Sequence, residues 1–123
     1  MKLRLRGDRV RLRLDRADLD RLAAEGRITA ELLTRGHSAA RWSYGVHLDP
    51  AVETLAVRLD AAGFRVLLPV GSGGDWLASE DEGFYGEDGG LHISLERDYR
   101  CLHRDAAGPE ESQAVDRPEP SPR

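Results

Sequence analysis

Residues 2–14 alternate strictly between cations and aliphatic side chains on either side of Gly7 and Asp8. Because successive side chains of a strand point to opposite faces, this pattern predicts a β-hairpin whose two loop residues are Gly7 and Asp8. One face of the hairpin then carries cations and the other carries aliphatic side chains. The facing cation pairs expected from this turn are Arg6 with Arg9, Arg4 with Arg11, and Lys2 with Arg13.

The hairpin is followed by the signals of a short helix. Asp15 stands where a helix N-cap is expected, and Asp18 lies three residues later, as in a capping box. Gly26 is a typical stop signal because glycine adopts the left-handed conformation that ends helices. These residues predict a helix over 16–25.

The rest of the chain returns to a period of two, which is typical of half-buried strands. Turn residues between the alternating segments predict hairpins, and the chain shows no other repeat of fixed period. We therefore expect an α+β fold with a single antiparallel sheet of about six to eight strands, and two short helices packed on its apolar face. The expected elements are strands at 30–34 and 42–48, a hairpin of 55–59 and 64–68, a short helix within 72–78, and a hairpin of 83–86 and 91–95.

Length and composition predict one globular domain with a tail. The chain has 123 residues, of which 40% are hydrophobic, and this length suits one hydrophobic core. Residues 105–123 contain four of the six prolines and few apolar side chains. Such a segment buries too little surface to offset the entropy of ordering. We expect a domain over 1–104 and a disordered Pro/Glu-rich tail over 105–123.

The charge pattern and the single cysteine bear on location and partners. No apolar stretch approaches the roughly 20 residues of a membrane span, and Cys101 has no partner for an intrachain disulfide. A cytoplasmic protein that does not bind membranes is therefore expected. The net charge of −4 does not favour a protein built chiefly to bind nucleic acid, because only residues 1–16 have a net positive charge.

Several segments together carry a resemblance to a known family. They are the opening MKLRLRGDRVRLRL, the short helix after it, the passage from Pro69 to Trp76, the Gly83-Phe84 turn and the segment Glu96–Leu102, which reads ERDYRCL. With these segments the chain resembles a family of short bacterial proteins of unknown function over most of residues 1–104. The resemblance implies one bacterial domain and supplies no activity, substrate or cofactor.

The cationic face of the first hairpin is the main candidate for function. Like charges that face each other across strands are destabilising, so an anion is expected nearby. One hypothesis is that acids of this chain neutralise the face, with Glu80, Asp81, Glu82, Glu87, Asp88 and Glu96 as candidates. The other is that the face recognises an anionic ligand or an acidic protein, with nucleic acid less favoured. We predict non-catalytic anion binding through Lys2, Arg4, Arg6, Arg9, Arg11 and Arg13.

Two alternatives come from other classes of protein. A small metal-binding protein or enzyme could use Glu96, Asp98, Cys101 and His103, since thiol and imidazole ligands suit zinc. In an unbroken strand, however, Cys101 and His103 would point to the core, and His92 would point to the opposite face. We therefore predict no metal, cofactor or catalytic residue. The other alternative is a structural interaction subunit with no small ligand, such as a homodimer formed through a sheet edge.

Overall fold

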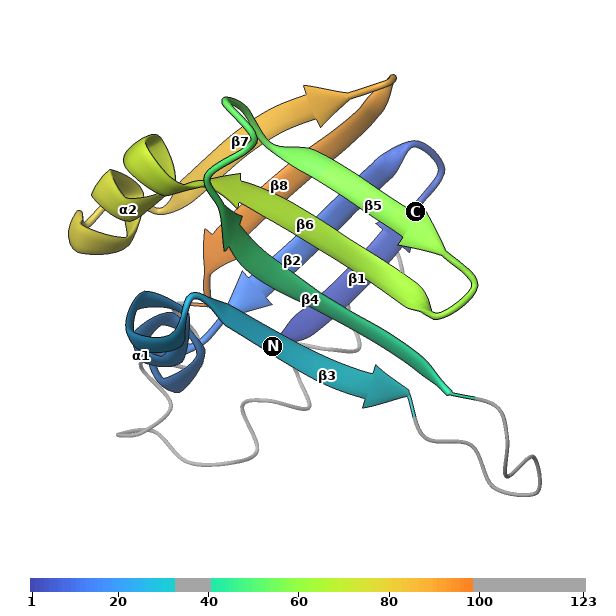
Figure 1. The fold of residues 1–123 in the computed structure, drawn as a ribbon, viewed down its shortest axis with the longest axis horizontal. Helices are drawn as coiled ribbons and strands as arrows, with labels where there is room; N and C mark the ends of the chain where they lie inside the picture. Colours follow the sequence, from blue (N-terminus) through green and yellow to red (C-terminus); the bar gives the residue numbers. More distant parts are fainter. Residues whose placement is uncertain (33–40, 99–123) are drawn as a thin grey trace.

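The computed structural model describes residues 1–32 and 41–98, and these residues form eight strands and two helices (Figure 1). The elements are β1 (Lys2–Arg6), β2 (Arg9–Leu14), α1 (Arg16–Glu25), β3 (Arg27–Leu32), β4 (Trp42–Asp49), β5 (Ala56–Asp60), β6 (Gly63–Pro69), α2 (Val70–Ala78), β7 (Gly83–Asp88) and β8 (Leu91–Arg97).

The strands form two four-stranded mixed sheets, and the prediction of a single antiparallel sheet is wrong. The first sheet has the order β1-β2-β8-β7 and the second has the order β3-β4-β6-β5. In each sheet two antiparallel strand pairs join through a parallel pair, β2 with β8 and β4 with β6. The two strand pairs are far apart along the chain in the first sheet and consecutive in the second. Alternation along one strand reveals its two faces, but it does not reveal which strand becomes its neighbour or in which direction. The broader α+β assignment is confirmed.

The first hairpin has the register that the sequence predicts. Lys2 faces Arg13, Arg4 faces Arg11 and Arg6 faces Arg9. Gly7 has a φ of 59°, a left-handed conformation that glycine adopts without steric cost, so the two-residue turn closes without strain. The two other expected hairpins are also present, as β5 with β6 and β7 with β8.

The hydrophobic core lies between the two sheets. The first sheet contributes Val10, Leu12 and Leu14 from β2 and Ile93 and Leu95 from β8, and the facing side chains from the second sheet include Val46, Val66 and Leu68. Figure 1 shows α1 and α2 together at one end of this sandwich. The helices therefore cover an end of the core, with Leu22 and Trp76 buried, and they do not lie on an apolar sheet face as predicted.

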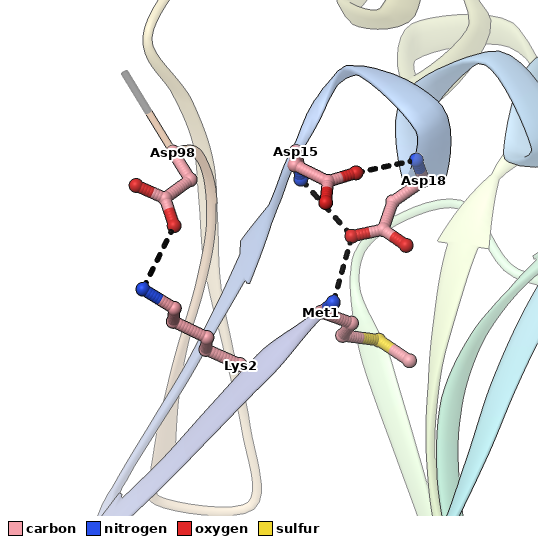
Figure 2. A network of polar contacts seen from close by, with 5 residues as sticks. All are labelled: Met1, Lys2, Asp15, Asp18 and Asp98. Atoms are coloured by element: carbon pink, nitrogen blue, oxygen red, sulfur yellow. Dashed lines mark hydrogen bonds and ion pairs between the residues drawn. The ribbon is translucent and has the colours of Figure 1, made fainter. Parts of the chain in front are cut away.

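The helix boundaries follow from their caps. The capping box at the start of α1 is confirmed, because Asp15 Oδ1 accepts from the Asp18 N–H at 2.8 Å and Asp18 Oδ2 accepts from the Asp15 N–H at 3.0 Å. The Met1 amine lies 2.8 Å from the same Asp18 carboxylate (Figure 2).

Helix α2 begins at Val70, two residues earlier than predicted, directly after Pro69 at the N-cap. Proline at that point fixes the backbone angle without losing a helical hydrogen bond.

The topology reveals an internal repeat that the sequence pattern alone did not indicate. The chain runs through β1-β2-α1-β3-β4 and then repeats the same series of elements as β5-β6-α2-β7-β8. The sheets repeat as well. The first has the order β1-β2-β8-β7, and the second, read from its other edge, has the equivalent order β5-β6-β4-β3. In both units a two-residue turn separates the first two strands, so residues 3–5 correspond to 57–59 and residues 10–14 to 64–68. The molecule is therefore built from two ββαββ units that exchange strands between the sheets.

Some predictions fall on residues that the structure does not describe. The domain boundary at 104, the tail at 105–123, Cys101 and His103 all lie outside the described residues, and so does the end of the strand expected over 30–34. Within the described ranges, neither helix has the length and apolar character needed to cross a bilayer.

Candidate anion-binding site

All six predicted cations lie on the outer face of the first sheet, as the alternation requires. The strand registers arrange this face in three rows that run from β1 across β2 and β8 to β7. The rows are Arg6, Arg9, His92 and Glu87; Arg4, Arg11, Ser94 and Tyr85; and Lys2, Arg13, Glu96 and Gly83. Positive charge is thus concentrated on β1 and β2, and the acids lie on the neighbouring strands.

Glu96 neutralises part of the cationic face. Its Oε1 lies 3.2 Å from Arg11 Nε and 3.9 Å from Arg13 Nε, and its side chain is only 12% exposed. The Tyr85 hydroxyl donates to Glu96 Oε2 at 3.1 Å. Burial and this hydrogen bond to Glu96 both raise the pKa of Tyr85, so the hydroxyl stays protonated and remains a donor. Glu96 is therefore a fixed carboxylate that holds Arg11 and Arg13 in place.

Asp98 neutralises the end of the face that lies away from the turn. Its carboxylate is 2% exposed and lies 3.4 Å from Lys2 Nζ (Figure 2). Its backbone N–H donates to the Leu14 carbonyl at 2.9 Å, which fixes the residue beside β2. Glu96 and Asp98, the carboxylates of the enzyme hypothesis, are thus each bound to different cations. Glu96 is one of the acids that the sequence analysis named as candidates to neutralise the cationic face, and it forms ion pairs there. Asp98 was not among those candidates, but it forms an ion pair with the same face.

The end of the face near the turn is different. Arg6, Arg9 and Arg11 line a hollow of about 210 Å³ together with Val10, His92 and Ser94. Among the residues that the structure describes, no carboxylate forms an ion pair with Arg6 or Arg9. Asp8 lies at the margin of the hollow, with its Oδ2 3.9 Å from His92 Nε2. The uncompensated positive charge is therefore concentrated at the turn.

This arrangement suits an oxyanion. Guanidinium groups present planar pairs of N–H donors that match the oxygens of a phosphate or a carboxylate. The Ser94 hydroxyl and the His92 imidazole, both lining the hollow, add groups that can hydrogen-bond an oxyanion. Because side chains alternate along a strand, His92 and Ser94 share one face of β8. Their place beside Arg9 and Arg11 was not predicted, because it depends on the parallel pairing of β2 with β8.

The hypothesis of a metal site gains no support from the described residues. In residues 1–32 and 41–98, no group of three or more His, Asp or Glu side chains is placed to hold a metal ion. Cys101 and His103, which the hypothesis requires, lie outside these ranges.

Comparison with known proteins identifies a family but no activity. A protein-family model described as a family of unknown function (DUF7009) matches residues 1–119. The comparison with curated proteins gave no match, and neither did the comparison with solved structures.

Proposed function

The chain belongs to the family of unknown function DUF7009, and since that family assigns no activity, we propose from the geometry that the protein binds an anionic ligand at the turn end of its first sheet. The binding residues are Arg6, Arg9 and Arg11, assisted by His92 and Ser94. The observation that carries the proposal is a hollow lined by three arginines, of which Arg6 and Arg9 lack an ion-paired acid among the described residues.

The other predicted cations have a supporting role in this proposal. Lys2 and Arg13 are engaged by Asp98 and Glu96. Arg11 belongs to both groups, because its Nε is held by Glu96 while the side chain lines the hollow. A guanidinium that is fixed in this way loses less conformational entropy when an anion binds. Of the six cations predicted to bind the anion, the proposed site therefore keeps the three near the turn, Arg6, Arg9 and Arg11.

The second hairpin, formed by β5 and β6, supports a functional origin of the cation cluster in the first hairpin. It corresponds to the first, strand for strand, but only Arg58 and Arg65 are cations at its six outer positions. The residue that corresponds to Arg6 is Asp60, and it forms an ion pair with Arg65 at 3.9 Å. The same hairpin architecture thus forms without a cluster of cations. The cluster in the first hairpin is not explained by the needs of the fold.

A binding measurement with matched variants tests the proposal. Binding of inorganic phosphate to the full chain is measured by calorimetry at low and moderate salt, for the unmodified protein, for the double variant R6Q/R9Q and for the control R58Q. The double variant should bind at least about tenfold more weakly and with a flatter salt dependence, because two charged hydrogen-bond donors are lost. The control lies on the other sheet and should bind like the unmodified protein. Equal binding by all three proteins would contradict the proposal.

A further inference from the structure

We propose that the ligand of the hollow is a compact dianionic oxyanion, namely a phosphate group of a small monoester or free phosphate, and not a polyanion or an acidic protein surface. This inference rests on the proposed function and specifies its ligand class. Three features of the site carry it: the count of unpaired cations, the size of the hollow and the acids that surround it.

The charge of the hollow matches a dianion. Of the three arginines that line it, Arg11 forms an ion pair with Glu96, whereas Arg6 and Arg9 have no ion-paired acid among the described residues. Two arginines without an ion-paired acid among the described residues thus line the hollow, and a ligand with two negative charges can pair with both of them. A phosphodiester or a carboxylate carries one negative charge and leaves one of these guanidinium groups without a counter-charge.

The size of the hollow suits a small anion. Its volume of about 210 Å³ is below the range of roughly 300–1,000 Å³ that is typical of pockets for drug-sized ligands. A phosphate group with a short substituent fits such a volume, whereas a nucleoside or a peptide segment would have to extend out of it.

Acids restrict the ways in which a longer anion could leave the hollow. Asp8 lies beside His92 at the turn, and Glu87 is the neighbour of His92 on β7. On the side of the hollow away from the turn, Glu96 is the next residue after Ser94 on the outer face of β8. A polyanion that runs along or across the sheet would meet these carboxylates, and like-charge contacts of this kind disfavour binding. A compact anion stays within the cationic area.

Ser94 and His92 complete the coordination. Both lie on the same outer face, between the cations of β2 and the residues Glu87 and Tyr85 of β7. Their side chains can hydrogen-bond oxygens that the arginines leave free. An oxyanion with several oxygens around one centre can use the arginines, the hydroxyl and the imidazole together, and a planar carboxylate with two oxygens can use fewer of them.

The decisive experiment compares four probes on the full chain by calorimetry: glycerol phosphate, sulfate, dimethyl phosphate and a single-stranded oligonucleotide. A phosphomonoester gains its second charge near pH 6, whereas sulfate is a dianion throughout. Between pH 5.0 and 7.5 the affinity for glycerol phosphate, divided by that for sulfate, should rise about tenfold, which is the rise in the dianion fraction. Taking this ratio cancels titration of the protein's own groups, including His92, Asp8, Glu87 and Glu96. Dimethyl phosphate should bind at least about tenfold more weakly than glycerol phosphate at pH 7.5.

Variants and chemical shifts locate the binding. R6Q and R9Q should each weaken glycerol phosphate binding about tenfold, and R58Q should leave it unchanged. In the unmodified protein, glycerol phosphate should shift the His92 side-chain resonances and the Ser94 amide, a result that does not depend on the folding of any variant. Inorganic phosphate in place of glycerol phosphate distinguishes the free anion from an ester, because the ester binds more tightly only if its substituent contacts the protein.

The outcomes separate this inference from the proposed function. If the oligonucleotide binds through Arg6 and Arg9 while glycerol phosphate does not, the ligand class is wrong and the anion-binding function stands. A ratio of glycerol phosphate to sulfate affinity that stays flat with pH also overturns the preference for a dianion. If no probe depends on Arg6 or Arg9, or if the shifts occur away from His92 and Ser94, both proposals fail.

Discussion

The outer faces of the two sheets have the same backbone plan and different chemistry. In the first hairpin every outer position is a cation, whereas in the second hairpin the corresponding positions are Ala56, Arg58, Asp60, Gly63, Arg65 and Leu67. The central pair is kept, since Arg4 faces Arg11 and Arg58 faces Arg65. The residues near the turn differ most, and it is at the turn of the first hairpin that the hollow forms.

The same contrast extends to the parallel neighbours. Glu96, which holds two arginines in the first sheet, corresponds in the second to His47, whose Nε2 is buried without a hydrogen-bond partner among the described residues. The inner positions show no such divergence, because residues such as Leu14 and Leu68 are apolar and fully buried in both units. Core packing therefore constrains the inner faces alike, and the outer faces are free to acquire different chemistry.

The largest expected effect tests the equivalence of the two cores. Leu14 and Leu68 occupy corresponding positions and are both 0% exposed. L14A and L68A should each lower the free energy of unfolding by about 2–5 kcal/mol, the usual cost of a leucine-sized cavity. Denaturant titration of both variants measures this loss. A loss below about 1 kcal/mol for either variant would show that the two cores are not equivalent.

The next effect concerns the two helix ends, which are held differently. Helix α1 ends at Gly26, whose N–H donates to the Leu22 carbonyl at 2.9 Å. Helix α2 is held by Arg97, which donates to the carbonyls of Trp76 and Ser79 at 2.8 and 2.7 Å and lies 5.1 Å from the Trp76 ring.

Replacing Arg97 should therefore reveal how strongly α2 depends on a side chain. R97A should lower the free energy of unfolding by about 2 kcal/mol, because charged hydrogen bonds are lost and the carbonyls lose a partner. R97K should recover only part of this, since one ammonium group cannot reproduce the planar fork. Denaturant titration of both variants is the measurement. If R97A were as stable as the unmodified protein, the contact would have no structural role.

A smaller effect should come from His47 and depend on pH. Burial, followed by the charges of Arg65 and Arg27, lowers the pKa of His47 below its ordinary value of 6.5, and Asp49 opposes this weakly. The unfolded chain then binds more protons than the folded one, so stability decreases as the pH falls from about 6.5 through the folded-state pKa. H47Q should remove the part of this loss of stability that comes from protonation of His47. Unfolding titrations at pH 7.5, 6.5 and 5.5 measure it, and identical pH profiles for both proteins would contradict the assignment.

The smallest effect on stability should come from the proposed site itself. Arg6 and Arg9 are exposed and face each other as like charges. R6Q/R9Q should change the free energy of unfolding by less than about 0.5 kcal/mol at moderate salt, with any change favouring the variant. Thermal and denaturant unfolding both report it. A clear loss of stability would mean that these arginines serve the fold, and the contrast with the second hairpin would lose its functional meaning.

Local sequence signals determined the elements of this protein. Alternation about Gly7 and Asp8 gave the first hairpin with its register, and Asp15 with Gly26 gave the limits of α1. Such predictions succeed because the periods of strands and helices and the caps of helix ends depend on residues that are close in the chain. The shared face of the six cations follows from the same local geometry.

Tertiary structure decided how the hairpins combine, and with that the site. Glu96 lies beside Arg11 and Arg13, and His92 and Ser94 enter the hollow, because β8 pairs in parallel with β2. That pairing joins segments about 80 residues apart, and its direction follows from how two units bury their apolar faces against each other. By itself, the sequence determined which side chains share a face. Only the packing of distant strands decided which cations are neutralised by acids and which remain to bind an anion.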